Sequence, residues 1–392
     1  MIKQDIPKIR FYSYQGAWVE KRIADIVKIS AGGDVDKERL KESGKYPVIA
    51  NSLTNKGIVG FYDDYKVKAP AVTVTGRGDV GYAVARHENF TPIVRLLTLQ
   101  SENIDVDYLE NQINSIRILN ESTGVPQLTA PQLGNYKVYH PEIEEQIAIG
   151  SLFRTLDELL TSYKDNLTNY QSFKATILSK MFPKAGQTVP EIRLGGFEGE
   201  WEFSSLGEQA DITKLAGFEF TNHVVYSDEG KIPAIRGLNV KNQKVNLSDV
   251  KYIDKSDFSK LDRSKLIEDD LLFTYVGTVG EVARVPESVL WYLAPNVSRI
   301  RLNRALDSRF VLYQMASNRF KQKQIFPLIA TSSQPALSMA NIRKFIISFT
   351  TLEEQRAIGS YFSNLDNLIN SHQEKITQLE TLKKKLLQDM FI

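Results

Sequence analysis

The feature that most constrains the fold of this chain is an internal duplication. Residues 144–182 align without a gap with residues 353–391, at an offset of 209, and 17 of the 39 positions are identical. Weaker matches extend the repeat upstream, and they pair Trp18 with Trp201, 47–49 with 233–235, 78–81 with 277–280, and 126–128 with 335–337. The offset grows from 183 to 209, so the second copy carries insertions. The chain therefore contains two copies of one unit, each a variable body followed by the repeated segment.

The repeated segment is predicted to be a long helix in each copy, over residues 141–183 and 351–392. Its apolar residues recur at spacings of three and four, which is typical of a helix stripe close to the coiled-coil period. Residues Thr351 to Glu354 match a capping box. About 40 residues make a rod of roughly 60 Å. The residues expected to pack helix on helix are Leu152, Leu156, Leu159, Tyr163, Tyr170 and Ile177 in the first copy, and Tyr361, Leu365, Leu368, Ile376, Leu379 and Leu386 in the second.

Two matched stripes favour packing of each helix on the other, although any single stripe also fits ordinary core packing. A pseudo-twofold relation between the copies would make the helices antiparallel and let them act as a ruler. The bodies, residues 1–140 and 200–350, are short strand-like runs broken by turn signals, with helical pieces at 105–116 and 308–324. Residues 184–199 read as a linker, because glycine and proline are frequent there. The predicted fold class is α+β: two mixed α/β domains joined by two long antiparallel helices.

Composition excludes several kinds of site. The chain has no cysteine, so disulfides, zinc-thiolate sites, iron–sulfur clusters and cysteine nucleophiles are ruled out. Its four histidines have no metal-ligand spacing, and no apolar run has the length of a membrane helix or of a signal peptide. We therefore expect no metal, no membrane and a cytoplasmic location. The net charge is only +2, with the two bodies mildly basic and the two helices mildly acidic.

No catalytic motif is apparent in the sequence. Residues 76–81 match the dinucleotide pattern GxGxxG, but a strand-like run follows instead of a helix, so a glycine-rich turn is the better interpretation. A phosphate-binding Walker loop is absent, and so is the Pro-Pro motif of N6-adenine methyltransferases. We expect this chain to catalyse no reaction itself.

The bodies do carry loops that mix basic, amide and small residues, at matching places in both copies. Arg, Asn and Gln make bidentate contacts with base edges, whereas Lys and Ser mostly hold phosphates. The same residue types also fill ordinary solvated turns, and for any single residue that reading stays open. The candidate DNA-binding residues are Asn51, Asn55, Lys56, Thr75, Arg77 and Gln127 in the first body, and Arg236, Asn239, Lys241, Asn242, Tyr275, Thr278, Ser332, Ser333 and Gln334 in the second.

The order of these features, repeated twice, resembles the specificity subunit of type I restriction–modification systems. The resemblance covers the whole chain and rests on Trp201 followed by Leu206-Gly207-Glu208, the glycine turn, the segment Pro335 to Ser338, and the helix that begins EEQxAIGS and ends in MF. The first copy departs from the pattern, because Ala24 replaces the usual glycine and Gly124-Val-Pro replaces Ser-Gln-Pro.

The resemblance implies that 1–140 and 200–350 are target recognition domains that each read one half of a bipartite, asymmetric site in double-stranded DNA. It implies that the helices set the unread spacer and dock the methyltransferase subunits, of which two are expected, and that restriction (motor-nuclease) subunits join the full complex. No cofactor is expected on this chain; S-adenosylmethionine, and ATP with Mg for restriction, are expected on the partners. Two alternatives remain at this point: a structural adaptor with two protein-binding domains on a helical spacer, and a self-contained nuclease or methyltransferase.

Overall fold

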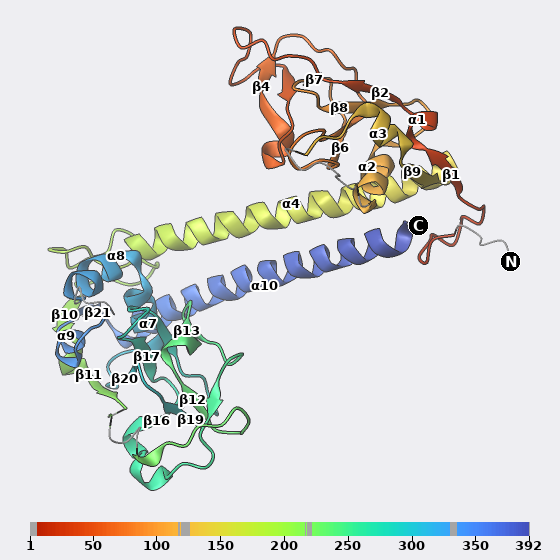
Figure 1. The fold of residues 1–392 in the computed structure, drawn as a ribbon. Coiled ribbons are helices and arrows are strands. Elements are labelled where there is room, and N and C mark those ends of the chain that lie inside the picture. The colour runs from red at the N-terminus through yellow and green to blue at the C-terminus, as the bar shows by residue number, and fades with distance from the viewer. Residues whose placement is uncertain are drawn as a thin grey trace. The chain divides into compact units, whose positions relative to one another are not determined.

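A computed structural model describes residues 6–116, 118, 126–215, 217, 222–329 and 335–391. The described chain divides into two compact units. Unit 1 combines residues 1–165 with residues 373–392, and unit 2 is residues 166–372. Each unit therefore contains one predicted recognition domain, the adjoining part of one long helix, and the adjoining part of the other (Figure 1).

In unit 1, short strands form three sheets, with the orders β1-β9, β2-β8-β5-β6 and β4-β3-β7. The strands are β1 (Val19–Arg22), β2 (Lys28–Ala31), β3 (Tyr46–Ile49), β4 (Ile58–Tyr62), β5 (Ala71–Val74), β6 (Ala83–Arg86), β7 (Thr91–Pro92), β8 (Leu97–Gln100) and β9 (Lys137–His140). The short helices are α1 (Ile23–Ile26), α2 (Val106–Ser115) and α3 (Ala130–Asn135). The predicted mixture of strands and short helices is confirmed in this domain.

Unit 2 repeats this plan with additions, in sheets ordered β10-β21, β11-β20-β17-β18, β15-β12-β19-β16 and β13-β14. Its strands are β10 (Glu202–Ser205), β11 (Ala210–Lys214), β12 (Pro233–Ile235), β13 (Val240–Lys241), β14 (Lys244–Val245), β15 (Lys251–Tyr252), β16 (Lys265–Leu266), β17 (Leu271–Thr274), β18 (Val282–Arg284), β19 (Trp291–Leu293), β20 (Val297–Leu302) and β21 (Ile346–Phe349). Its short helices are α5 (Leu206–Gln209), α7 (Ser308–Ala316), α8 (Asn318–Phe320) and α9 (Met339–Arg343). Strand β15 pairs with β12 as β4 pairs with β3, whereas the β13-β14 hairpin and β16 have no counterpart among the strands described in unit 1.

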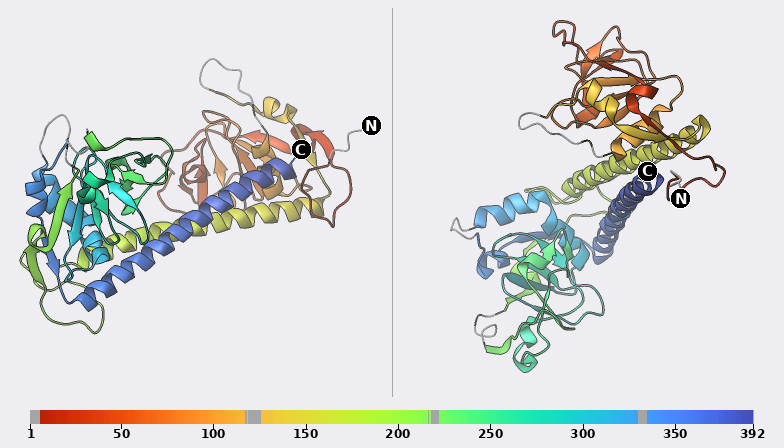
Figure 2. Two further views of the ribbon diagram at one scale, coloured as in Figure 1. Left: turned by 90° about the horizontal axis from the view of Figure 1, so that it is seen from below. Right: turned by 45° about the vertical axis from the view of Figure 1, so that its right-hand side comes forward.

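The two long helices are α4 (Ile143–Lys180) and α10 (Leu352–Met390). In unit 1 the start of α4 lies antiparallel to the end of α10, as the ion pairs Asp157–Lys383 at 2.6 Å and Lys164–Glu380 at 2.7 Å show. In unit 2 the ion pair Lys174–Asp366 at 2.6 Å joins the other parts of the same helices (Figures 1 and 2). The offset of 209 relates the pairs Asp157–Lys383 and Lys174–Asp366. The predicted antiparallel packing is confirmed within each unit.

Each long helix ends in an aromatic cluster of the other domain. The helix α10, which follows domain 2, ends in unit 1, and the helix α4, which follows domain 1, ends in unit 2. Phe391, at the end of α10, contacts Trp18, Tyr108 and Phe153 in unit 1, with ring centroids 5.6–6.5 Å apart. Phe182, just after α4, contacts Trp201 and Phe310 in unit 2 at 5.9 and 5.2 Å. Aromatic pairs of this geometry add to the stability of a core. The duplicated Met-Phe ending is thus an anchor for the helix end.

The segment predicted to be a linker is bonded to the long helices, and so is a matching segment at the N-terminus. We call these two segments straps. Within the N-terminal strap (residues 6–18), the Arg10 guanidinium donates two hydrogen bonds of 2.7 Å to Glu145 at the start of α4. Within the inner strap (residues 189–201), Arg193 makes the same pair of 2.7 Å bonds to Glu354 at the start of α10. Ile9 N–H donates to Asp389 O, and Ile192 N–H donates to Lys180 O. The straps are therefore equivalent parts of the repeat, each closing its unit.

The helix stripe was predicted partly wrongly. Leu156, Leu365, Ile376 and Leu379 are buried, but Leu159 and Leu368 are 42% and 38% exposed. Two series with spacings of three and four pass through Leu156, and the buried one runs through Phe153 and Leu160. Leu159 lies about 100° around the helix from Leu160, because one residue turns an α-helix by that angle. The other predicted packing residues, Leu152, Tyr163, Tyr170, Ile177, Tyr361 and Leu386, are partly buried.

Within the described ranges, none of the helices combines the length and the apolarity that a bilayer crossing requires. In the same ranges, no three His, Cys, Asp or Glu side chains are grouped to hold a metal ion.

Candidate nucleic-acid interface

Both domains contain the same turn, built by the same backbone hydrogen bonds. In domain 1 it spans Thr75 to Gly81 between β5 and β6, and Gly78 N–H donates to Pro126 O at 3.1 Å. In domain 2 it spans Thr274 to Gly280 between β17 and β18, and Gly277 N–H donates to Pro335 O at 3.0 Å. Gly78 and Gly277 have φ values of 78° and 80°, which favour glycine. A strand follows the turn in each domain, so the dinucleotide-binding alternative is excluded for this motif.

Two further loops reach this turn because the strands before them are parallel. In domain 1, β7 lies parallel to β3, and Ile93 N–H donates to Ile49 O at 2.9 Å. In domain 2, β19 lies parallel to β12, and Ala294 N–H donates to Ile235 O at 3.0 Å. Parallel strands end at the same edge of a sheet, so the loops that follow them begin side by side. The turn and these two loops form what we call the three-loop junction: 50–52, 75–81 and 94–95 in domain 1, and 236–238, 274–280 and 295–296 in domain 2.

Different side chains fill the junction in the two domains. In domain 1, Asn51 links all three loops: Oδ1 accepts from Gly76 N–H at 2.7 Å, and Nδ2 donates to Val94 O at 2.6 Å. The matching residue in domain 2 is Gly237, which has no side chain to make these bonds. There, Tyr275 N–H donates directly to Asn296 O at 3.2 Å.

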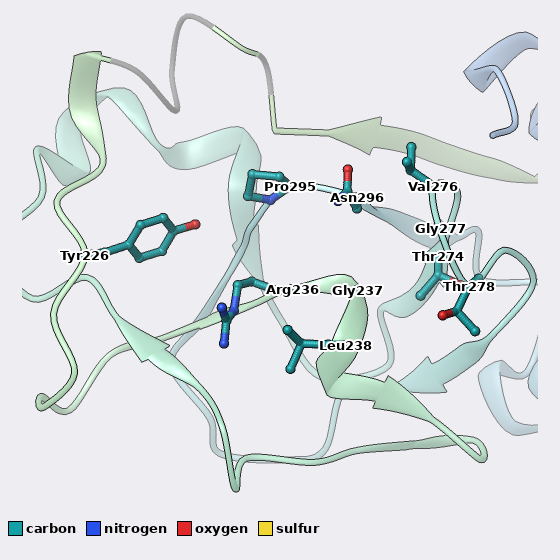
Figure 3. A pocket seen from close by; sticks show the side chains of 10 residues that line it. All are labelled: Tyr226, Arg236, Gly237, Leu238, Thr274, Val276, Gly277, Thr278, Pro295 and Asn296. Carbon is teal, nitrogen blue, oxygen red and sulfur yellow. Dashed lines mark hydrogen bonds between the residues drawn. The ribbon is translucent and has the colours of Figure 1, made fainter. Parts of the chain in front are cut away.

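A pocket of about 420 Å³ opens at the junction of domain 2 (Figure 3). Residues from all three loops line it, together with Tyr226: Arg236, Gly237, Leu238, Thr274, Val276, Gly277, Thr278, Pro295 and Asn296. Its polar groups are donors and acceptors of the kinds that contact base edges. The absence of a side chain at Gly237 accounts for part of this space.

Domain 1 presents positive charge at the same place. Among the six arginines that the structure describes in residues 6–140, four have hydrogen-bond or ion-pair partners: Arg10, Arg22, Arg39 and Arg86. Arg77 and Arg95 are exposed, and the side chain of neither has such a partner among the described residues. Both belong to the three-loop junction. A Cβ atom on Gly76 would lie 2.9 Å from Arg95 O, so the two loops are in close contact.

Left-handed turns lie beside the junction in both domains. Asn55 and Lys56 have φ values of 48° and 50°, and buried Arg86 donates to Lys56 O at 2.7 Å. Burial lowers the pKa of Arg86 to about 10. In domain 2, Asn242 N–H donates to Glu281, which also accepts from Lys321 Nζ at 2.9 Å. Burial opposes ionisation of Glu281, but these bonds outweigh it and lower its pKa.

The predicted DNA-binding residues fall into four groups: exposed, partly exposed, outside the described residues, and a fourth group for which the prediction is corrected. Exposed, and so accessible to DNA, are Asn55, Lys56, Arg77, Gln127, Lys241, Asn242 and Thr278. Arg236 and Tyr275 are partly exposed, and Arg236 already donates to Asp249 O at 2.6 Å. Ser332, Ser333 and Gln334 lie outside the described residues.

Three predictions are corrected, because the side chains hold the loops together. Thr75 is buried, and its hydroxyl donates to Asp79 O and accepts from Tyr82 N–H. Asn239 is 1% exposed, and its amide accepts from Arg236 N–H and donates to Asn246 O. Asn51 has both ends of its amide bonded internally, as described above. In the structure these three side chains bond the backbone of the loops around them.

Sequence reasoning missed the third loop, Val94-Arg95 and Pro295-Asn296. The two loops share no residue, so the repeat gave no signal there. What they share is a left-handed residue, with φ values of 61° at Arg95 and 72° at Asn296.

Comparisons with known proteins agree with this architecture. A model of the family described as type I restriction modification DNA specificity domain matches twice, over residues 15–169 and 198–381. The type I restriction enzyme MjaVIII specificity subunit of Methanocaldococcus jannaschii is 22% identical over 403 residues, covering 94% of this chain and 91% of that protein.

Solved structures show the same fold. An S subunit of a type I restriction–modification system from M. genitalium aligns with a TM-score of 0.68 and 16% identity, over 99% of both chains. A chain from a structure of complex assembly in the type I R-M system aligns with a TM-score of 0.51 and 14% identity, over 96% of this chain and 98% of that one. The two family matches each cover a recognition domain with its three-loop junction and most of the helix that follows, and the chain therefore belongs to the family of type I restriction–modification DNA specificity domains.

Proposed function

We propose that this chain is the DNA-recognition subunit of a type I restriction–modification complex, and that each of its domains reads one half of a bipartite, asymmetric site. The observation that carries the proposal is the three-loop junction: its glycine turn and its parallel strands have the same backbone bonds in both domains, and its side chains differ. An unchanged frame with different contents suits a protein that performs one task on two different sequences. The chain would supply recognition and leave bond-making to its partners.

The exposed residues fit direct reading of DNA. Arginine and asparagine make bidentate contacts to purines in the major groove, and lysine neutralises phosphates. Arg77 in domain 1 and Thr278 in domain 2 lie on the same turn, while Lys56 lies on the neighbouring turn of domain 1 and Lys241 ends β13 in domain 2. Two unlike half-sites follow from the different side chains.

Two matched apolar patches on the helices support two copies of a methyltransferase partner. In unit 1, Leu159 and Leu382 are 42% and 45% exposed; in unit 2, Leu368 and Phe173 are 38% and 46% exposed. The ion pairs Asp157–Lys383 and Lys174–Asp366 place the two residues of each patch at one level of the helix pair. An offset of 209 relates the patches, so one kind of partner would bind twice.

The remaining parts of the complex follow from this assignment. S-adenosylmethionine would be held by the methyltransferase subunits, and ATP with Mg by restriction subunits, with none of them on this chain. The complex would work in the cytoplasm, where the DNA that it modifies is found.

Base-resolution methylation mapping tests the proposal. The chain is co-expressed with its partner adenine methyltransferase subunit, and the modified adenines of the host DNA are mapped. The expected result is one bipartite motif with two unlike half-sites around an unread spacer, and a purified complex with two methyltransferase copies per chain. A contiguous motif, two identical half-sites, or methylation without any sequence preference would overturn it.

The helices are proposed to set the length of the spacer. Seven residues inserted after Asp165 in α4 and after His372 in α10 add two turns, or about 10 Å, and keep the helical phase. The ion pairs between the helices are kept. Since B-DNA rises about 3.4 Å per base pair, the spacer should grow by about three base pairs with both half-sites unchanged. An unchanged spacer in the mapped motif would contradict this role.

A further inference from the structure

The third loop of the junction occupies the same position in both domains. Its left-handed residue is Arg95 in domain 1 and Asn296 in domain 2. Each lies two residues after a residue whose N–H donates to the parallel strand, Ile93 and Ala294. Each also contacts the glycine turn: Arg95 O approaches Gly76, and Asn296 O accepts from Tyr275 N–H. The position is thus fixed by the frame, and only the side chain differs.

The backbone at this position is held in place despite its conformational cost. Val94 has a φ of 53°, which is unfavourable for a β-branched residue by about 1–3 kcal/mol. Val94 N–H donates to Gly33 O at 2.7 Å, and Arg95 N–H donates to Gly32 O at 3.1 Å. A Cβ atom on Gly32 would come within 2.7–2.8 Å of the backbone at Pro92 and Ile93, so the two segments touch. The loop is therefore an organised support for the side chain of Arg95.

Both side chains are available to a ligand. Arg95 is exposed, and its guanidinium has no ion pair or hydrogen bond to another described residue. Asn296 is exposed and lines the pocket at the junction, where its Cβ atom lies 3.5 Å from the position that a Cβ atom on Gly237 would take (Figure 3). Of the three loops, this one alone was not suggested by the sequence.

The two side chains have different hydrogen-bonding groups, which predict the base that each of them prefers. The fork of an arginine guanidinium matches O6 and N7 of guanine, and the amide of asparagine matches N6 and N7 of adenine. We propose that Arg95 and Asn296 are specificity-determining residues at the same place in the two domains, and that they select a guanine in one half-site and an adenine in the other. This inference rests on the proposed function, because it needs the domains to bind DNA.

An exchange of the two residues tests the inference. Arg95→Asn should change one guanine of one half-site to adenine, and Asn296→Arg should change one adenine of the other half-site to guanine. Both changes place a residue that the other domain already accommodates in the left-handed conformation. Each complex is purified with its methyltransferase, and the mapped motif is compared with that of the unchanged chain.

Alanine variants measure the size of the effect. Arg95→Ala should reduce the preference for guanine over the other bases about tenfold to a hundredfold at one position, since a bidentate contact discriminates by about that much. Lys37→Ala, an exposed lysine of the same domain outside the junction, is the control and should leave every base preference unchanged. Thermal unfolding of each variant confirms that the domain is folded.

The possible outcomes separate this inference from the proposed function. An unchanged chain that yields no bipartite motif overturns the proposed function. A bipartite motif that stays the same in both exchange variants overturns the inference alone. The inference is also wrong if Arg95→Ala weakens binding equally at all sequences, which indicates a phosphate contact, or if both exchanges alter the same half-site.

Discussion

The two recognition domains differ most in the side chains of the three-loop junction, where their backbones agree best. Domain 1 closes the three-loop junction with the side chain of Asn51, whereas domain 2 has Gly237 there and keeps a pocket. The turn carries Arg77 in one domain and Val276 in the other, although the same backbone bonds hold both turns. Because the same backbone bonds hold the turn in both domains, residue 77 and its counterpart 276 can differ without a change in the frame of the turn. A new DNA specificity therefore does not require a new fold.

The contact between each domain and the long helices also has a matching position with different side chains. In unit 1, Glu110 of α2 lies among Asp157 and Lys383, while the matching residue of α7 in unit 2 is buried Leu312. Burial, followed by the charge of Asp157, raises the pKa of Glu110 to about 7. One unit thus has a titratable group where the other has an apolar contact.

The largest expected effect concerns the straps, where the two units are most alike. Arg10→Ala should destabilise unit 1 by about 3–5 kcal/mol, because it leaves the buried carboxylate of Glu145 without its partner. Arg193→Ala should cost unit 2 somewhat less, since Glu354 still accepts from the Thr350 hydroxyl at 2.6 Å. Hydrogen exchange, followed separately in the two units, measures both losses.

Lys137→Ala is the control for this pair of variants. It breaks an exposed ion pair with Glu20, and such pairs contribute at most about 1 kcal/mol. Equal protection in Arg10→Ala and the control would show that the strap does not hold unit 1 together.

The next largest expected effect is a pH dependence of stability that arises from Glu110 and therefore belongs to unit 1 alone. The folded state binds a proton at Glu110 more tightly than the unfolded state, so the stability of unit 1 should fall as the pH rises from about 4.5 to 7. Glu110→Gln removes this dependence and should stabilise unit 1 at pH 8 by up to about 3 kcal/mol, with little change at pH 4.5. Hydrogen exchange at both pH values measures it.

Glu102→Gln, at an exposed position, serves as the control and should leave the pH dependence of unit 1 as it is. A Glu110→Gln protein that still loses stability across the same pH range would place the responsible group elsewhere.

The smallest effect concerns the junction itself. Asn51→Gly gives domain 1 the residue that domain 2 has, and it removes two hydrogen bonds worth about 1–3 kcal/mol together. We expect relaxed base preference in the half-site of domain 1 and an unchanged half-site of domain 2 in the mapped motif. Ser52→Gly, next to it in the loop, controls for backbone freedom. Equal relaxation in the two variants would mean that Asn51 has no special part in the junction.

The sequence predicts those parts of the molecule in which the structure demands a particular type of residue at a particular position. The helices, the strand-rich domains and the glycine turn could be predicted because spacing, turn residues and the duplication all indicate them. The inner strap could also have been found, since Pro190, Ile192, Arg193, Gly199 and Trp201 repeat Pro7, Ile9, Arg10, Gly16 and Trp18 at a constant offset of 183. Its glycine and proline content is also typical of a linker.

Other features could not be predicted from residue types. Leu159 and Leu160 fit a helix stripe equally well until the partner helix is placed. Thr75 and Asn239 are polar loop residues like their neighbours, and only the fold shows that they bond the backbone. Arg95 and Asn296 correspond through backbone conformation alone, which no similarity of residues reveals.

The position of Phe391 also affects how the chain is made. Unit 2 is one continuous stretch, so all of its parts have been synthesised by residue 372, whereas unit 1 needs residues 373–392 for its core. Domains generally fold in the order in which they leave the ribosome. Here the domain that is synthesised first is completed last, once residues 373–392 have been made. A prematurely terminated chain would therefore contain a finished second domain and an open first one.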